Sequence, residues 1–142
     1  QTPIDLLPIL ESSEDVVVEV RDKLGYQTMG RMNFKHPPFD NKQIRQAALK
    51  AMSQEPVLAT LIGNPDYYQQ CGAIFGCGTP LATESLTSGG DVEGAKKLLE
   101  EAGYDGTPVV LMQPTDVVTL TAQPVVAAQQ LREAGFKVKR FS

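Results

Sequence analysis

The chain has 142 residues, of which 42% are hydrophobic and 21% are charged, and its net charge at pH 7 is −4. A chain of this length is typical of one domain and can bury roughly two thirds of its unfolded surface in a core. It has no basic cluster and no Trp, and no apolar run approaches the ~20 residues that span a bilayer. We therefore expect a globular protein with no nucleic-acid partner and no membrane insertion of this segment.

The chain begins with a predicted helix and two predicted strands. Pro3 and Pro8 suit the start, or a kink, of a short helix over Gln1–Leu10, which is rich in Leu and Ile. The β-branched run Val16–Val20 (VVVEV) predicts a strand, and the loosely alternating Tyr26–Phe34 predicts a second one. We expect the two strands to pair in antiparallel fashion if the turn between them is tight.

Two helices are predicted next. The proline pair at 37 and 38 excludes a helix there, and Asp40 followed by Gln43 has the pattern of a capping box. A stripe of mostly alanine predicts an amphipathic helix over Asn41–Met52 that can lie close to a sheet. A second, short helix is expected within residues 53–63, which open with a serine cap and close with a glycine.

The longest stretch without periodicity is residues 64–90. Such a long loop is uncommon inside a compact domain and is either functional or packed against other elements. Its Tyr67 and Tyr68 favour packing over stacking on a ligand. The stretch also holds both cysteines of the chain, Cys71 and Cys77, and the chain has one histidine. These are too few ligands for a zinc site, so we expect no metal.

The last third of the chain predicts a helix followed by a βαβ unit. The strands are expected at Thr107–Met112 and Phe136–Phe141, with a helix between them at Gln123–Ala134. The helix before the unit ends at Gly103 and the helix within the unit ends at Gly135. Each of these glycines is preceded by Glu-Ala and followed by an aromatic residue. A glycine there can close a helix in the left-handed conformation, and strands joined through a helix run parallel. The sequence therefore predicts an α/β domain, a small mixed sheet with a βαβ unit flanked by helices.

The loop Gln113–Thr121 follows the first strand of this unit and is the predicted ligand site. Ligands of open α/β sheets usually bind beyond the carboxyl ends of the strands. The loop offers hydrogen-bonding side chains at Gln113, Thr115, Asp116 and Thr119, and Asp116 suits a cation or an amine. The alternative is that Thr115 or Asp116 caps the following helix. No nucleophile–base set and no glycine-rich phosphate loop occurs, so we expect neither an enzyme with catalytic residues nor a cofactor.

Two separated stretches of the chain carry a resemblance to a known family. Residues 32–49 (MNFKHPPFDNKQIRQAAL) are similar to a pattern of Asn, a spacer, Pro-Pro-Phe-Asp, a spacer and Val-Arg-Gln-Ala-Leu. Residues 91–142 contain AKKLLEEAGY at 95–104 and LREAGFKV at 131–138, which are similar to a later pattern of the same proteins. Both patterns are those of the extracellular solute-binding protein family 5, the receptors of ABC importers for dipeptides, oligopeptides and nickel. The resemblance extends over nearly the whole chain.

The resemblance implies that residues 1–142 are a single domain excised from a larger two-lobed receptor. The segment is similar to most of the C-terminal lobe, domain III, in a fold of the periplasmic-binding-protein type II kind. The implied partners are a peptide or similar small solute, the ABC permease subunits and the missing N-terminal lobe of the same chain. The implied location is periplasmic or extracellular, with or without a lipid anchor. The alternatives are a ligand-sensing regulatory domain built on the same lobe and a stand-alone α/β enzyme domain.

The resemblance also carries expectations for single residues. In peptide-binding relatives the loop at Gln113–Thr121 can supply an arginine for the ligand's carboxylate; here it has no Arg or Lys, which argues against carboxylate recognition by this loop. An exported protein meets an oxidising environment, in which Cys71 and Cys77 are expected to form a disulfide. Arg45 is expected to be part of the scaffold and to anchor its helix through a partly buried ion pair; the alternative is that it contacts a ligand.

Overall fold

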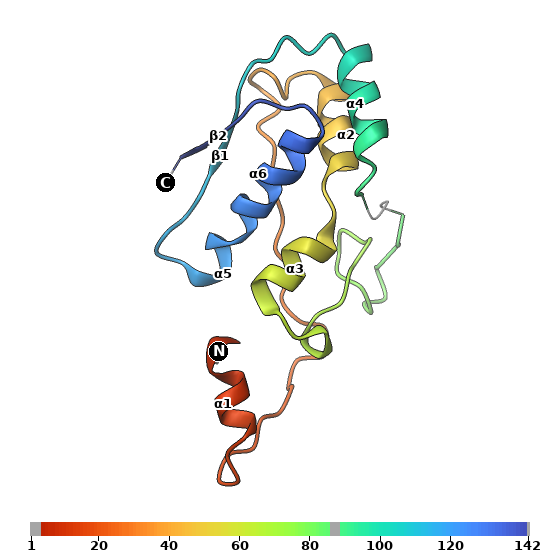
Figure 1. Ribbon diagram of the computed structural model, residues 1–142. Helices are drawn as coiled ribbons and strands as arrows, with labels where there is room; N and C mark the ends of the chain where they lie inside the picture. The colour runs from red at the N-terminus through yellow and green to blue at the C-terminus, as the bar shows by residue number, and fades with distance from the viewer. Residues whose placement is uncertain (1–3, 86–88, 142) are drawn as a thin grey trace.

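The computed structural model describes residues 4–85 and 89–141 (Figure 1). Its elements in chain order are the 3₁₀-helix η1 (Ile4–Leu6), α1 (Leu7–Glu11), α2 (Lys42–Ala51), α3 (Gln54–Ile62), the 3₁₀-helix η2 (Pro65–Tyr67), α4 (Val92–Glu101), β1 (Val109–Met112), α5 (Val118–Thr121), α6 (Gln123–Glu133) and β2 (Val138–Phe141). None of the helices in these two ranges has the length and apolar character needed to cross a bilayer. The α/β class predicted from the sequence is confirmed.

The predicted βαβ unit is present. β1 and β2 pair in parallel, with Val109 opposite Val138 and Met112 opposite Phe141, and α5 and α6 connect them. Val109 is buried beneath α6, whereas the next residue, Val110, is 62% exposed on the other face. Side chains alternate between the faces of a strand, so one face of the pair is covered by α6 and the other leaves Val110, Met112 and Phe141 open to solvent.

The main core lies where α2 packs against α4, with α6 and β1 beside them. The buried side chains of these two helices are mostly alanine: Ile44, Ala47, Ala48 and Ala51 of α2, and Ala95 and Leu99 of α4. Small side chains let two helix backbones approach closely. We expected the alanine stripe to lie against a sheet, and it packs against α4 instead. The predicted helices over residues 41–52 and 53–63 are both confirmed as α2 and α3.

The end of α2 is tied to the start of α4. The N–H of Asp91 donates to the carbonyl of Lys50 at 2.9 Å, and the Lys50 ammonium lies 2.6 Å from the Asp91 carboxylate. This ammonium, together with an N–H of α4, holds the pKa of Asp91 below its usual range. The chain reaches this junction through Gly89, where a Cβ would lie 1.6 Å from the carbonyl oxygen of Met52. Only glycine fits so close to another backbone.

The prediction that a glycine ends both α4 and α6 is confirmed, and the two helix ends have the same hydrogen-bond pattern. Gly103 after α4 and Gly135 after α6 have φ angles of 65° and 97°. The next residue, Tyr104 or Phe136, donates its N–H to the carbonyl of the leucine five positions earlier, at 3.0 Å in both cases. This is the Schellman arrangement. It turns both aromatic rings inward, and their centroids lie 5.5 Å apart in the core.

The two strands predicted near the N-terminus are wrong. Residues 16–20 and 26–34 have no strand structure, and the side chain of Val17 is 91% exposed. β-branched residues favour strands because they fit a pleated, half-buried surface, and the described residues offer this segment no such surface. The helix predicted at the N-terminus is confirmed as η1 and α1; residues 1–3 lie outside the described ranges.

The turn before α2 differs from the prediction in two details. The cap of α2 is Asn41, whose Oδ1 accepts the N–H of Gln43 at 2.8 Å, and not Asp40. The Asp40 side chain instead accepts the N–H of Asn41. This hydrogen bond belongs to the turn, one residue before the cap of α2. Arg45 anchors this turn, but through the backbone and without an ion pair: its Nη1 donates to the carbonyls of Phe39 at 2.6 Å and Asp40 at 3.0 Å. The scaffold role of Arg45 is confirmed and the expected ion pair is not found in the described part of the chain.

Candidate functional site

The predicted ligand loop lies at the carboxyl end of the sheet. β1 ends at Met112, and the N–H of Gln113 donates to the carbonyl of Phe141 at 2.7 Å, so the ends of both strands meet here. The loop contains a short helix that the sequence did not predict, α5, before the chain enters α6 (Figure 1). This edge is where parallel sheets usually present their ligand-binding loops.

Gln113 is the most constrained of the four candidate residues. Its Nε2 donates to the carbonyl of Thr121 at 3.3 Å, and its Oε1 accepts Nη1 of Arg140 at 3.2 Å. One half-buried amide thus connects the end of α5 with β2. Gln113 therefore forms the base of the loop.

Thr115 and Asp116 lie on an exposed bend between Gln113 and α5. The interpretation of these residues as helix caps is wrong. The N-cap residue of α5 is Val117 and that of α6 is Ala122, and no side chain of the described residues makes a capping hydrogen bond to either helix. Neither Thr115 nor Asp116 has a side-chain hydrogen bond to another residue within 4–85 or 89–141. Their oxygen atoms are open to solvent at the carboxyl edge of the sheet.

Thr119 lies within α5 and is half-buried. Its carbonyl accepts Nε2 of Gln123 at 2.8 Å, and the hydroxyl of Thr121 lies 3.0 Å from the carbonyl oxygens of both Pro114 and Val117. These bonds fold the loop back on itself. The structure therefore places Gln113 at the base, Thr115 and Asp116 on the bend, and Thr119 on the return of a single compact loop.

Arg140 is a residue of this edge that the sequence reasoning missed. It lies in β2, opposite Leu111 in the parallel register, and its guanidinium reaches Gln113. The sequence signal that points to it is the parallel pairing itself, because residues that end two adjacent parallel strands lie side by side. The loop has no cation of its own, and β2 brings one to it.

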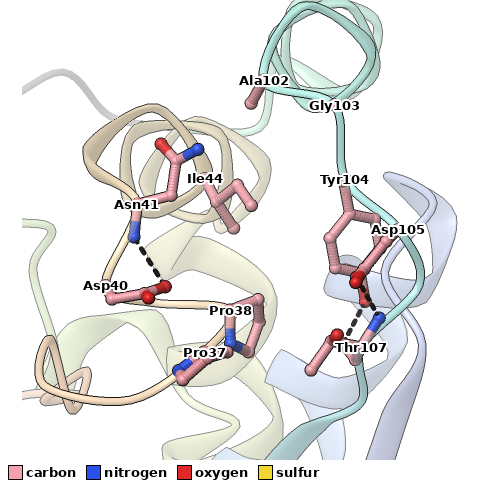
Figure 2. A pocket seen from close by; sticks show the side chains of 10 residues that line it. All are labelled: Pro37, Pro38, Asp40, Asn41, Ile44, Ala102, Gly103, Tyr104, Asp105 and Thr107. Carbon is pink, nitrogen blue, oxygen red and sulfur yellow. Dashed lines mark hydrogen bonds between the residues drawn. The ribbon is translucent and has the colours of Figure 1, made fainter.

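The structure also has an open hollow of about 400 Å³ at the other end of β1 (Figure 2). Its lining consists of the turn before α2 and the corner between α4 and β1: Pro37, Pro38, Asp40, Asn41, Ile44, Ala102, Gly103, Tyr104, Asp105 and Thr107. Its two carboxylates serve local turns. Asp105 accepts the N–H of Thr107 at 2.8 Å, and hydrogen bonds from Thr107 hold the pKa of Asp105 below its usual range. This hollow lies at the amino end of β1, away from the predicted loop, and we place the candidate site at the loop.

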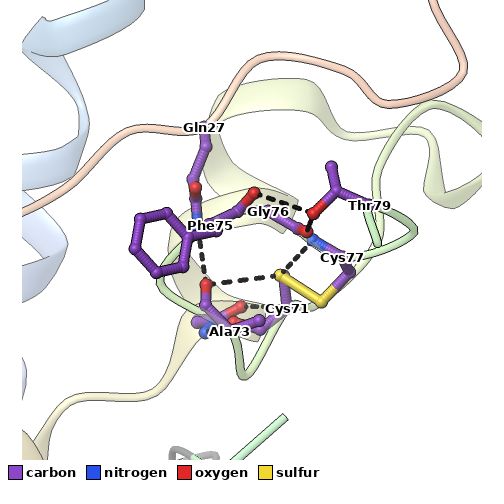
Figure 3. Close-up of a disulfide and its surroundings, with 8 residues drawn as sticks. Gln27, Cys71, Ala73, Phe75, Gly76, Cys77 and Thr79 are labelled. Atoms are coloured by element: carbon purple, nitrogen blue, oxygen red, sulfur yellow. Dashed lines mark hydrogen bonds between the residues drawn. A yellow bond between two sulfur atoms is a disulfide. The ribbon is translucent and has the colours of Figure 1, made fainter. Parts of the chain in front are cut away.

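The predicted disulfide is confirmed: Cys71 and Cys77 are bonded, with their Cα atoms 5.6 Å apart (Figure 3). The bridged loop is held from two sides. The side-chain amide of Gln54 in α3 makes bonds of 2.7 and 2.6 Å to the N–H and carbonyl of Cys71, and Gln27 donates to the carbonyl of Ala73 at 3.0 Å. Within the described ranges, no group of three or more His, Cys, Asp or Glu side chains is arranged to hold a metal ion.

The comparisons with known proteins agree with this fold. The family "Bacterial extracellular solute-binding proteins, family 5 Middle" matches residues 1–140. A Sinorhizobium fredii protein named "Probable peptide ABC transporter periplasmic-binding protein y4tO" is 38% identical over 137 residues, which are 94% of this chain and 26% of that protein.

Two solved structures are similar in fold. The ABC transporter substrate-binding protein CtaP of Listeria monocytogenes superposes with a TM-score of 0.69 at 22% identity, over 77% of this chain and 23% of that one. AgaA of A. tumefaciens R10, solved with agropinic acid, superposes with a TM-score of 0.56 at 20% identity, again over 77% of this chain and 23% of that one. The chain therefore spans about a quarter of the length of the relatives that it matches. Because the family match extends over residues 1–140, the chain belongs to the bacterial extracellular solute-binding proteins of family 5.

Proposed function

We propose that this chain is part of the C-terminal lobe of a two-lobed receptor that serves an ABC importer. The receptor captures a peptide or a similar small solute between its lobes and delivers it to the permease subunits. The observation that carries this proposal is the 38% identity, over 94% of the chain, to a protein named as a peptide ABC transporter periplasmic-binding protein. The disulfide supports a periplasmic or extracellular location, because such bonds persist in oxidising compartments.

The proposed ligand contacts of this lobe are the four side chains of the loop, Gln113, Thr115, Asp116 and Thr119. Asp116 is exposed, is not engaged by a partner in the described ranges, and carries a negative charge that suits an amine of the solute. Closure of the N-terminal lobe over this edge would bury the solute, and the higher affinity of the closed state for the solute drives that closure. The proposed role involves binding and conformational change, without a covalent step.

The proposal is tested with the complete receptor, purified and freed of bound solute. The receptor is incubated with a mixture of short peptides, the retained peptides are identified by mass spectrometry, and the dissociation constant of one of them is then measured. We expect Asp116→Asn to weaken binding of peptides with a free amino group by up to about fivefold, because an exposed ion pair contributes about 0.2–1 kcal/mol.

The matched control is Asp105→Asn, which removes a carboxylate at the hollow and leaves the loop unchanged. We expect this control to bind peptide as the unaltered receptor does. Retention of no peptide by the unaltered receptor would contradict the proposed function. Weaker binding by Asp105→Asn together with unchanged binding by Asp116→Asn would move the site from the loop to the hollow.

A further inference from the structure

The loop closed by the Cys71–Cys77 disulfide presents an apolar tip. Ile74 and Phe75 lie in the middle of this loop and are 60% and 68% exposed, and the ring of Phe75 points away from the disulfide (Figure 3). We propose that Ile74 and Phe75 dock onto the N-terminal lobe of the same receptor when the two lobes close over a solute. This inference rests on the proposed function and adds to it a contact surface between the lobes.

The backbone of this tip is fixed from several sides. The disulfide closes the loop, and the side chains of Gln54 and Gln27 hold its first residues by hydrogen bonds to the backbone. The hydroxyl of Thr79 lies 3.2 Å and 3.0 Å from the carbonyl oxygens of Phe75 and Gly76. A tip whose backbone is already ordered loses little conformational entropy when a partner buries its side chains. The exposed apolar pair is therefore suited to docking.

The stretch around the tip carries no charge. Residues 67–83 contain no Asp, Glu, Lys, Arg or His, although 21% of the whole chain is charged. The side chain of Leu24 is 59% exposed and lies beside Gly78, with its Cδ2 3.3 Å from the position that a Cβ on this glycine would take. The apolar surface thus extends from the tip to the base of the loop. The cores of protein interfaces are depleted in charged residues and enriched in aromatic ones, so this composition is typical of a contact surface.

The position of the tip favours the other lobe over the solute as its partner. α3 packs against α6, and the two helices lie between the disulfide loop and the candidate loop at Gln113–Thr121 (Figure 1). A short solute at the candidate loop would have to pass around both helices to reach the tip. A lobe is large enough to meet both loops, because both lie away from the α2–α4 core. This chain spans 26% of its curated relative, which leaves room for such a lobe in the same protein.

Docking of the tip would raise the affinity for solute without touching the solute. A contact that exists only in the closed state shifts the equilibrium toward that state, which is the state that holds the solute. Truncation of Phe75 should therefore weaken the binding of every solute by the same factor. We expect a factor of about ten, the scale of burying the exposed two thirds of a phenylalanine side chain.

The test uses the complete receptor, freed of solute, and a mixed-sequence pool of peptides of three to five residues. Dissociation constants are obtained by mass spectrometry from retention at several receptor concentrations. Phe75→Ser should weaken binding of all retained peptides about tenfold with an unchanged midpoint of urea unfolding, and Phe75→Leu should keep most of the affinity. Leu81→Ser is the matched control, because Leu81 is 74% exposed in the same uncharged stretch but lies outside the bridged loop. It should bind peptides as the unaltered receptor does.

A second measurement follows the tip itself. Phe75 of the complete receptor is replaced by 4-(trifluoromethyl)phenylalanine, and its ¹⁹F resonance is recorded with and without the peptide pool. We expect the resonance to move when the pool is added, because the label passes from water into the contact between the lobes. The same label at Phe34, which is 62% exposed in the turn before α2, should give a resonance that stays in place.

Four results overturn the inference. Unchanged affinity of Phe75→Ser, or a resonance at position 75 that does not move, rejects the lobe contact and leaves the receptor function standing. A loss of affinity confined to peptides with apolar residues assigns the tip to the solute. A receptor that sediments as a dimer and becomes monomeric with Phe75→Ser assigns the tip to a second copy. Retention of no peptide by the unaltered receptor rejects the proposed function, and the lobe contact falls with it.

Discussion

Removal of the Cys71–Cys77 disulfide should lower the free energy of unfolding by about 2.2 kcal/mol, the value that the loop-closure relation gives for a sequence separation of 6. The perturbation is the double substitution Cys71→Ser and Cys77→Ser. The short loop places this value near the lower end of the usual range for disulfides, because few residues are constrained in the unfolded chain. Urea unfolding with linear extrapolation measures the change, and reduction of the unaltered protein with a thiol reagent is the control that leaves the sequence intact.

The structure sharpens this prediction, because the loop is also held by native contacts. Gln54 makes two hydrogen bonds to the backbone of Cys71, and these stabilise the folded state, whereas the disulfide restricts the unfolded one. Because Gln54 contacts Cys71 directly, we expect the losses from Gln54→Met and from the double serine variant to couple by about 0.5 kcal/mol or more instead of adding. A loss below about 0.5 kcal/mol for the serine variant, the size of an ordinary surface substitution, would refute the reasoning. A titration of the denatured, unreduced protein should find no free thiol, and two reactive thiols would refute the bond itself.

Three further predictions concern the core and the junction of α2 with α4. Leu131→Ala removes a fully buried side chain and should lower the free energy of unfolding by about 3 kcal/mol; a loss under about 1 kcal/mol would show that the site is not tightly packed. Gly89→Ala forces a Cβ onto the carbonyl oxygen of Met52 and should cost more than about 2 kcal/mol in urea unfolding, and an unchanged midpoint would contradict the close approach. The folded-state pKa of Asp91 is lowered chiefly by Lys50, so its contribution to stability is present above the unfolded pKa and is lost as the pH falls through the folded pKa. Asp91→Asn should flatten the acid side of the stability–pH curve, and a curve with unchanged slope would argue against the ion pair.

The parts of the fold that follow from local signals were predictable from the sequence. Gly103 and Gly135 end their helices because the left-handed conformation is open to glycine, and the aromatic residue after each is drawn into the core. The apolar stripe of α2 predicts correctly which face of that helix is buried. The strands predicted at residues 16–20 and 26–34 failed because a strand exists only with a partner, and no local pattern reveals whether a partner is present.

The position of the loop Gln113–Thr121 in the fold was predictable, whereas the residues that lie next to it were not. The order of strand, loop, helix and strand places the loop at Gln113–Thr121 at a carboxyl edge, before any coordinates are known. The sequence could not assign Arg140 to the same edge, because that depends on the register between two strands separated by a helix. It also gave no sign that α5 would begin too late for Thr115 or Asp116 to cap it.

The open face of the β1–β2 pair has a practical consequence for work with this segment. Val110, Met112 and Phe141 lie together on it, and both strands have an outer edge whose backbone groups can accept a further strand. Such an apolar, unprotected surface promotes stacking and edge-to-edge joining of molecules. A preparation of the 142-residue segment should therefore become turbid with rising concentration. Replacing Met112 and Phe141 with lysine should keep it monodisperse for light scattering or NMR without touching the alanine-lined interior.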